Sequence, residues 1–109
     1  MLIERIVNEL QLEVLTSCPL DKEAEGIYIG DLLSVVMSQA KKNQIWMTVQ
    51  THVNVIAIAS LLELSAIIIV EEQEMDDETL KKANEENIVV LRSTLPAYEL
   101  SVRIKPYIG

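Results

Sequence analysis

The sequence predicts a small α/β domain whose sheet is mainly parallel. Short apolar runs alternate along the chain with segments of about ten residues that have helical spacing of apolar positions. The run at 66–70 (AIIIV) is apolar throughout, which is typical of a strand covered on both faces. Strands that alternate with helices imply right-handed crossovers. We therefore expect a two-layer or three-layer sandwich, formed as a single domain over residues 1–109.

From the N-terminus, the first predicted elements are a helix at 2–10 and strands at 12–16 and 26–30. Asp31 follows the second strand and belongs to the residue types that favour a helix N-cap, so a helix is expected over 31–41. Asn43 is expected to end this helix in the left-handed conformation.

Three further strands are predicted, at 44–49, 66–70 and 88–92. Thr51 is expected to cap a helix that runs to about Glu63. Asp76 or Asp77 is expected to cap the next helix, which Asn87 ends. The closing helix lies in 93–108, with Thr94 as its cap and Pro96 in its first turn.

The helix after Thr51 is apolar on nearly every side. Val53 and Ala57 belong to one apolar stripe, and Val55 and Ile58 belong to another. A helix of this kind must be buried on more than one face. In so small a domain the sheet covers one face, so the other is expected to meet a neighbouring helix or a second subunit. We therefore expect a homodimer.

Composition places the chain among globular proteins. Half of the residues are hydrophobic, yet no apolar run approaches the 18 or so residues that a membrane helix needs. The first ten residues include Glu4 and have amphipathic spacing, whereas a secretion signal begins with basic residues and an unbroken apolar stretch. A cytoplasmic location is therefore expected.

Charge and cysteine content exclude several functions. With 9 Lys and Arg against 17 Asp and Glu, the net charge of −8 disfavours nucleic acid and anionic membrane surfaces as partners. Cys18 is the single cysteine, so one subunit forms no disulfide and holds no cluster or zinc site that needs several thiolates. We expect no metal and no cofactor.

The glycine and histidine content argues against an enzyme. Glycine occurs only at positions 26, 30 and 109, which leaves neither a phosphate-binding P-loop nor a dinucleotide-binding fingerprint. His52 is the single histidine, and no local spacing places a nucleophile, a base and an orienting carboxylate together. The sequence therefore predicts no catalytic residue, and a small enzyme that uses His52 is the least favoured reading.

Polar residues follow the strands at the edge of the sheet where ligands of parallel α/β folds bind. Free backbone N–H groups and the positive end of a helix dipole suit these turns to a phosphate or carboxylate. Arg92 could add a bidentate contact, while Asp31 or Asn54 could receive a sugar hydroxyl. The predicted ligand-binding residues are Gly30, Asp31, Thr51, His52, Asn54, Arg92, Ser93 and Thr94. The alternative is that Asp31, Thr51 and Thr94 merely cap their helices.

These same stretches resemble a known family. The segments Gly30-Asp31-Leu32-Leu33-Ser34, Thr51-His52-Val53-Asn54 and Leu91-Arg92-Ser93-Thr94 are similar to those of stand-alone DRTGG-domain proteins of anaerobic bacteria, relatives of HPr kinase. The resemblance covers nearly the whole chain. It implies a fold similar to the amino-terminal, non-catalytic domain of HPr kinase, without that enzyme's phosphate-binding loop. The family's naming motif is degenerate here, because Asp21-Lys22-Glu23-Ala24-Glu25-Gly26 occupies its region.

The resemblance also implies a metabolic role and a partner. Related domains accompany nucleotide-binding CBS modules and precede some phosphotransacetylases, and stand-alone members are encoded near iron-hydrogenase or other electron-transfer subunits. This implies a regulatory or accessory role in anaerobic redox metabolism, with a redox enzyme as a partner. The lone cysteine indicates that this protein would not itself carry the iron–sulfur cluster.

Two functional hypotheses follow. The first is a non-enzymatic regulatory module that binds a small anionic metabolite or nucleotide at the strand tips. The second is a protein-interaction or structural accessory domain without a ligand.

Overall fold

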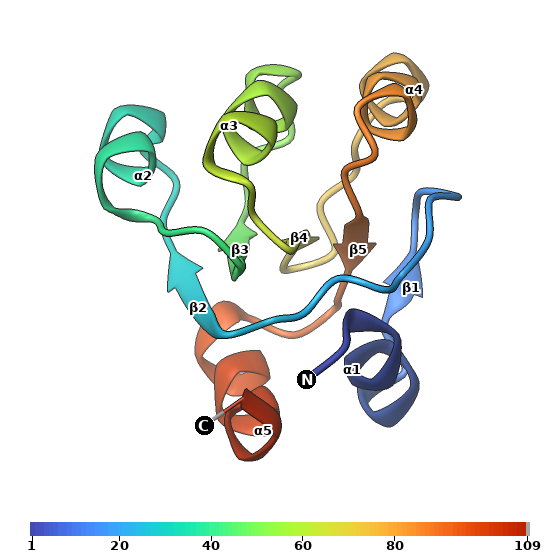
Figure 1. The fold of residues 1–109 in the computed structure, drawn as a ribbon, viewed down its shortest axis with the longest axis vertical. Helices are drawn as coiled ribbons and strands as arrows, with labels where there is room; N and C mark the ends of the chain where they lie inside the picture. Colours follow the sequence, from blue (N-terminus) through green and yellow to red (C-terminus); the bar gives the residue numbers. More distant parts are fainter. Residues whose placement is uncertain (109) are drawn as a thin grey trace.

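The computed structural model describes residues 1–108 as a three-layer α/β sandwich (Figure 1). A five-stranded sheet with the strand order β1-β5-β4-β3-β2 forms the middle layer. Helices α2, α3 and α4 cover one face of the sheet, and α1 and α5 cover the other. The predicted fold class is confirmed.

The sheet is parallel except at one edge. Neighbours from β2 to β5 pair in parallel, and β1 pairs with β5 in the antiparallel direction. The strands are β1 (Glu13–Val14), β2 (Gly26–Ile29), β3 (Gln44–Thr48), β4 (Ala66–Ile69) and β5 (Val90–Arg92). Each lies within a run that the sequence predicts to be a strand and is shorter than that run.

The helices also lie where the sequence places them, with shifted ends. They are α1 (Ile3–Leu10), α2 (Leu33–Gln39), α3 (Asn54–Leu62), α4 (Asp77–Glu85) and α5 (Ala97–Ile108). Helix α5 begins just after Pro96, whose carbonyl accepts a hydrogen bond from the Leu100 N–H at 3.1 Å. Proline suits this position because the N–H that it lacks has no partner there.

The sheet separates two apolar cores. Ile45 and Met47 of β3 face α1 and α5, whereas Trp46 between them faces the three helices of the other layer. This alternation follows from the two-residue period of a strand. Every residue of β4 is buried, which confirms that the apolar run at 66–70 is covered on both faces.

Helix α3 is buried along one side and open along another. Val55, Ile56, Ile58 and Ala59 are buried, whereas Val53 is 42% exposed and Leu61 is 68% exposed. The predicted stripe with Val55 and Ile58 is thus covered, whereas the stripe with Val53 and Ala57 is covered at Ile56 and exposed at Val53, Ala57 and Leu61.

Three predicted helix caps are wrong. Leu32 precedes α2 and Val53 precedes α3, each without a side-chain cap, so neither Asp31 nor Thr51 is the N-cap. Thr94 lies three residues before the start of α5. In contrast, Asp76 does cap α4: its Oδ1 accepts a hydrogen bond from the Thr79 N–H at 2.8 Å.

Left-handed backbone occurs at the turns. Asn43 and Asn87 have positive φ angles, as predicted, although α2 ends at Gln39 and Asn43 therefore lies in the turn beyond it. Glu71 and Glu72 also have positive φ angles, of 57° and 59°, in the turn that follows β4.

No helix in the stretch 1–108 is both long and apolar enough to cross a membrane.

Candidate functional site

The carboxyl ends of the four parallel strands lie along one edge of the sheet, as the fold class requires. The predicted site residues follow β2, β3 and β5 at this edge. Because β4 and β3 separate β5 from β2, the residues after β5 and those after β2 lie several strand spacings apart. The predicted set therefore does not form one site.

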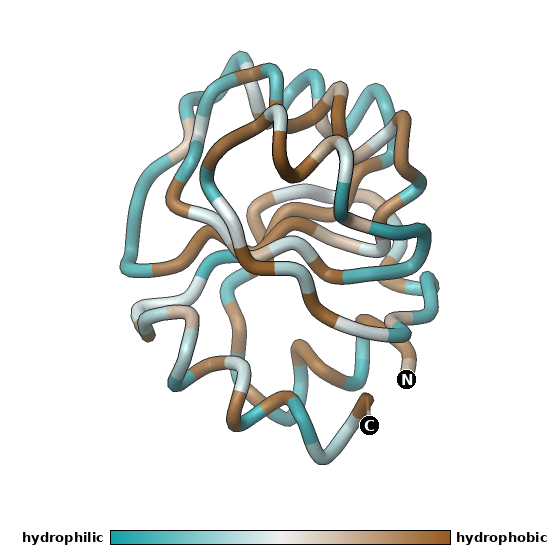
Figure 2. Tube along the Cα trace, turned by 90° about the vertical axis from the view of Figure 1, so that its left-hand side faces the viewer, coloured by the Kyte–Doolittle hydropathy of each residue, from teal (hydrophilic) through white to brown (hydrophobic). Residues whose placement is uncertain are grey.

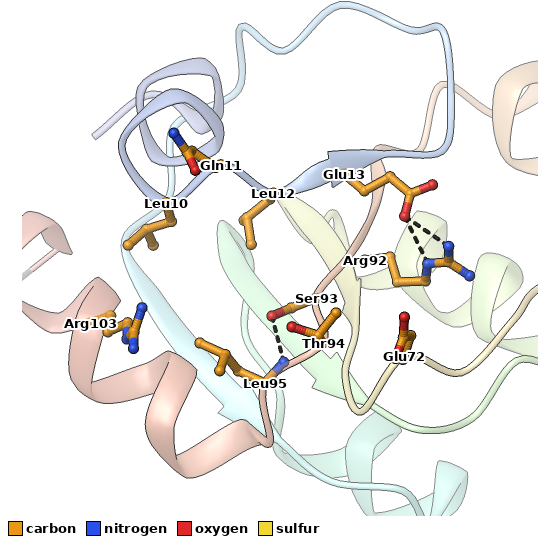
Figure 3. Close-up of a pocket in the computed structure, with 10 residues that line it drawn as sticks. All are labelled: Leu10, Gln11, Leu12, Glu13, Glu72, Arg92, Ser93, Thr94, Leu95 and Arg103. Carbon is orange, nitrogen blue, oxygen red and sulfur yellow. Dashed lines mark hydrogen bonds and ion pairs between the residues drawn. The ribbon is translucent and has the colours of Figure 1, made fainter.

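The residues after β5 border a pocket of about 280 Å³ (Figure 3). We call it the Arg92 pocket. Its walls come from the end of α1, from β1, from the turns after β4 and β5, and from α5. The lining residues are Leu10, Gln11, Leu12, Glu13, Glu72, Arg92, Ser93, Thr94, Leu95 and Arg103.

Arg92 is held by Glu13 of the neighbouring strand. Its Nε and Nη2 atoms lie 2.9 and 2.8 Å from the same carboxylate oxygen, Oε1 of Glu13. The pairing follows from the sheet, because Glu13 and Arg92 are directly opposite in the antiparallel β1–β5 pair. The Arg92 side chain remains 23% exposed, and its guanidinium has further donors besides the two that bond to Glu13.

Ser93 and Thr94 form a turn whose backbone is fixed. The Ser93 N–H donates to the Ile69 carbonyl at 2.9 Å, and Ser93 Oγ accepts from the Leu95 N–H at 3.1 Å. The serine therefore orders this turn, while Thr94 lies at the pocket wall.

The turn after β4 is bonded to the turn after β5. The N–H groups of Glu71 and Glu72 donate to the carbonyls of Leu95 and Ser93, at 3.2 and 2.9 Å. These bonds occupy backbone donors that could otherwise have faced an anion. Recognition in this pocket therefore depends on side chains.

Arg103 is the lining residue that sequence reasoning missed. It projects from α5 on the far side of the pocket from Arg92 (Figure 3). Within residues 1–108 its guanidinium has no hydrogen bond or ion pair. Its helical phase was a usable signal, since Leu100 and Ile104 face the core and Arg103 falls beside them.

The residues after β2 tie that strand to β3. Asp31 Oδ1 accepts hydrogen bonds from Thr48 Oγ1 at 2.7 Å and from the Val49 N–H at 2.9 Å. The Asp31 carbonyl accepts from Gln50 Nε2 at 3.1 Å. Asp31 thus joins two strand ends, which explains why it does not cap α2. Glycine suits position 30, because a Cβ there would lie only 3.0 Å from the Tyr28 ring.

The residues after β3 lie apart from Arg92. His52 precedes α3 rather than lying in its first turn, and its Nδ1 accepts a hydrogen bond from the Asn54 N–H at 3.1 Å. His52 lines a second pocket, of about 300 Å³, between α3 and α4. Neither Thr51 nor Asn54 borders this pocket or the Arg92 pocket.

Two carboxylates border the second pocket, as Glu13 and Glu72 border the Arg92 pocket. Asp76 and Glu78 line the second pocket together with His52 and Lys82. The hydrogen bonds from Thr79 hold the pKa of Asp76 below its ordinary value, and the charge of His52 contributes less. Asp76 therefore stays ionised and adds negative charge beside His52.

Of the predicted site, the structure thus brings together Arg92, Ser93 and Thr94. It adds Arg103 and Gln11 to them and places Gly30, Asp31 and the residues of the Thr51 turn elsewhere. In the described part of the chain, no group of three or more His, Cys, Asp and Glu side chains could hold a metal ion.

Comparison with known proteins shows the fold. No family model and no curated protein matches the chain. Among solved structures, it is similar to the CBS and DRTGG domains of the regulatory region of Clostridium perfringens pyrophosphatase, complexed with the activator diadenosine tetraphosphate. The TM-score is 0.69 at 14% sequence identity. The match covers 92% of this chain and 44% of that one, so this chain has a DRTGG-like fold but spans less than half the length of its neighbour.

Proposed function

We propose that this chain is a regulatory module without catalytic activity, and that it binds a small anionic metabolite or nucleotide in the Arg92 pocket. The observation that carries the proposal is the pair of arginines on opposite sides of one pocket, in a chain whose net charge is −8. Arginine forks match phosphate and carboxylate oxygens, and Ser93 and Thr94 add polar groups at the same wall.

The comparison with known structures supports the ligand class. The similar regulatory region of the pyrophosphatase is complexed with a dinucleotide that activates it. A regulatory, nucleotide-binding role in this chain is therefore in keeping with its fold, while the site itself is argued from the residues of this chain.

The Glu13–Arg92 pair offers a way to signal binding. Both arginine contacts go to one carboxylate oxygen, so an anion in the pocket competes with Glu13 for the guanidinium. Strand β1 is two residues long and lies at the edge of the sheet next to β5. Loss of the Glu13 contact would loosen β1, and with it the end of α1 that borders the pocket.

A thermal-shift measurement tests the proposal. The probes are AMP, ATP, diadenosine tetraphosphate and inorganic pyrophosphate. A ligand at ten times its Kd stabilises the folded state by about 1.4 kcal/mol, which raises Tm by roughly 5–10 °C in a domain of this size. Arg92→Gln and Arg103→Gln should abolish the shift.

Arg5→Gln is the matched control, because Arg5 is an exposed arginine of α1 outside the pocket and should leave the shift intact. If no probe raises Tm, the alternative of an accessory domain without a ligand is favoured. A shift that survives Arg92→Gln would place the ligand elsewhere.

We further propose that the module works in the cytoplasm, as a homodimer, in anaerobic redox or hydrogenase metabolism. The metabolic setting rests on the sequence resemblance alone. It is tested by the affinity of the purified chain for electron-transfer proteins encoded beside it, and absence of binding at micromolar concentrations would count against it.

A further inference from the structure

The two arginines of the Arg92 pocket belong to opposite faces of the sheet. Val90 of β5 packs in the core beneath α2, α3 and α4, and Leu91 packs in the core of α1 and α5. Because side chains alternate between the two faces of a strand, Arg92 lies on the same face as Val90. Arg103 projects from α5, and Figure 1 and Figure 2 both show this helix, which leads to the label C, on the other side of the sheet. The pocket therefore passes around the end of β5 from one face to the other.

Glu13 keeps Arg92 on its face of the sheet. The two residues are directly opposite in the antiparallel β1–β5 pair, so their side chains share one face. Both contacts of the Arg92 guanidinium, at 2.9 and 2.8 Å, go to Oε1 of Glu13. A single phosphate or carboxylate group that lies against Arg92 in this position is separated from Arg103 by the end of the strand.

Leucine side chains form the wall between the two arginines. Leu12 is buried in the core of α1 and α5, while Leu10 and Leu95 are half-buried and pack against that core. Figure 3 shows these three side chains between Arg103 and the Ser93–Thr94 turn. Because a charged group loses hydration against apolar side chains, this wall favours an uncharged part of a ligand.

Neither arginine alone makes a strong anion site. Glu13 and Glu72 lie beside Arg92 (Figure 3), so an anion there meets a rival for the guanidinium and a second carboxylate. Arg103 is exposed, and a contact between an exposed arginine and an anion contributes little because water screens it. A ligand that engages both arginines combines the two weak contacts, and the second contact forms at a high effective concentration.

We propose that the preferred ligand is a two-ended anion, in which two phosphate or carboxylate groups are joined by a short uncharged segment. One anionic group lies against Arg103, the uncharged segment lies along the leucines, and the other group replaces Glu13 at Arg92. This inference rests on the proposed function and narrows its ligand class. The pocket volume of about 280 Å³ is at the lower end of the range for small-molecule sites, so the joining segment is short.

Calorimetric titration with matched pairs of probes tests the inference. Adipate is compared with hexanoate, and fructose 1,6-bisphosphate with fructose 6-phosphate, so that the members of each pair differ by one anionic group. In at least one pair, the two-ended probe should bind about tenfold more tightly than its counterpart, because it gains a charge-assisted contact. The net charge of −8 acts against the more charged probe, so overall charge does not explain such a preference. The pair with the larger ratio shows whether carboxylate or phosphate is the preferred group.

Arg103→Gln is the variant that isolates the second contact. It should remove the preference, so that both probes of a pair bind the variant with equal, weak affinity. Arg103→Lys keeps a positive charge at this end and should retain part of the preference. Arg5→Gln is the matched control, since this exposed arginine of α1 lies outside the pocket and its loss should leave the preference unchanged. Circular dichroism shows whether each variant is folded.

A length series tests whether both ends are engaged at once. The dicarboxylates from malonate to suberate differ only in the number of methylene groups between their carboxylates. Affinity for the wild type should be highest at the length that spans from Arg103 to Arg92 and should fall for shorter and longer members. The same series should show no such maximum with Arg103→Gln.

The outcomes distinguish this inference from the proposed function. If ATP or inorganic pyrophosphate binds in the Arg92 pocket, but two-ended probes bind no more tightly than one-ended ones, the inference is overturned and the proposed function stands. A preference that persists in folded Arg103→Gln also overturns the inference. If none of these anions binds at millimolar concentration, the inference and the proposed function are both overturned.

Discussion

At the scale of single residues, the main finding is that side-chain oxygens near the strand tips have partners other than those that local sequence suggests. Asp31 precedes a helix, yet its carboxylate binds Thr48 and Val49 of the neighbouring strand end. Thr51 has no capping bond at α3, whereas Asp76 caps α4 as its sequence context predicts. Competition from a neighbouring strand end explains why Asp31 does not cap α2, but it does not explain Thr51.

This difference predicts unequal costs for two substitutions. Asp31→Ala removes two hydrogen bonds, one of them from the buried Thr48 hydroxyl, and should lower the free energy of unfolding by about 1–3 kcal/mol. Thr51→Ala should change it by less than about 0.5 kcal/mol. Urea denaturation measures both. An equal loss in the two variants would mean that Thr51 does cap α3.

Asp76 makes stability depend on pH. Its pKa lies below the ordinary value of 3.8, mainly because the Thr79 N–H bonds to the ionised form. A lowered pKa contributes stability that is present above the unfolded-state pKa and is lost as the pH falls through the folded-state pKa. Asp76→Asn keeps a capping oxygen but does not titrate.

The expected result is that the wild type exceeds Asp76→Asn in free energy of unfolding at pH 6, and that the difference shrinks as the pH falls from about 4 through the lowered pKa of Asp76. Urea titrations at a series of pH values measure it. A difference that stays constant from pH 6 to pH 3 would contradict the assignment.

The Glu13–Arg92 pair predicts a gain of binding. If an anion and Glu13 compete for the same guanidinium, Glu13→Gln should lower the Kd for a phosphate probe by about threefold to tenfold, because the rival carboxylate is removed. Calorimetric titration with ATP or inorganic pyrophosphate measures this. Weaker binding in Glu13→Gln would show that Glu13 instead holds Arg92 in its binding position.

At the scale of elements, the turn after β4 carries strain. Glu71 and Glu72 both have positive φ angles, and the Gln73 N–H bonds back to the Val70 carbonyl, which describes a tight turn favoured by Asn-Gly. Left-handed backbone costs an ordinary residue about 1 kcal/mol or more. The hydrogen bonds from this turn to Ser93 and Leu95 hold it in place beside the Arg92 pocket.

Relieving this strain should stabilise the protein. The double substitution Glu71→Asn and Glu72→Gly is expected to raise the free energy of unfolding by about 1–2 kcal/mol, as measured by thermal or urea denaturation. Asn87→Gly serves as a comparison, because Asn87 already tolerates its left-handed conformation. No gain in the double variant would mean that the two glutamate side chains stabilise the folded state by as much as the left-handed backbone destabilises it.

The type and position of elements with a strong apolar pattern could be predicted from the sequence, whereas their first and last residues and the turns between them could not. The run at 66–70 predicted a strand buried on both faces, because an all-apolar run of this length between polar residues is typical of a central strand in a covered sheet. The turn at 71–72 gave no signal, since its geometry is imposed by bonds to residues some twenty positions away and not by turn-favouring residues.

At the scale of the whole molecule, the strand order determines which of the predicted site residues lie together, and the sequence does not show the strand order. The alternation of elements predicts a parallel sheet, but it does not predict that two strands separate β5 from β2. That order splits the predicted ligand residues and brings Arg103, from the far end of the chain, opposite Arg92. The helical phase of α5 places Arg103 beside the core-facing Leu100 and Ile104, but contacts between distant segments carry no local pattern, so the phase does not show that Arg103 meets the turn after β5.

The whole-molecule charge has a consequence for the proposed dimer. Two copies that each carry a charge of −8 repel one another, and salt screens that repulsion. The proposed dimerisation should therefore strengthen as the sodium chloride concentration rises, as measured by sedimentation. A dimer that weakens with salt would point to an interface built on ion pairs.

The most direct test of the proposed function is a nuclear magnetic resonance titration of isotope-labelled protein with diadenosine tetraphosphate and, separately, with inorganic pyrophosphate. The largest shifts are expected at the backbone amides of Arg92, Ser93 and Thr94 and at the side-chain Nε of Arg103, four groups that border one pocket. The account is contradicted if neither ligand shifts these signals at millimolar concentration, or if the shifts gather around His52 and Asp31 instead.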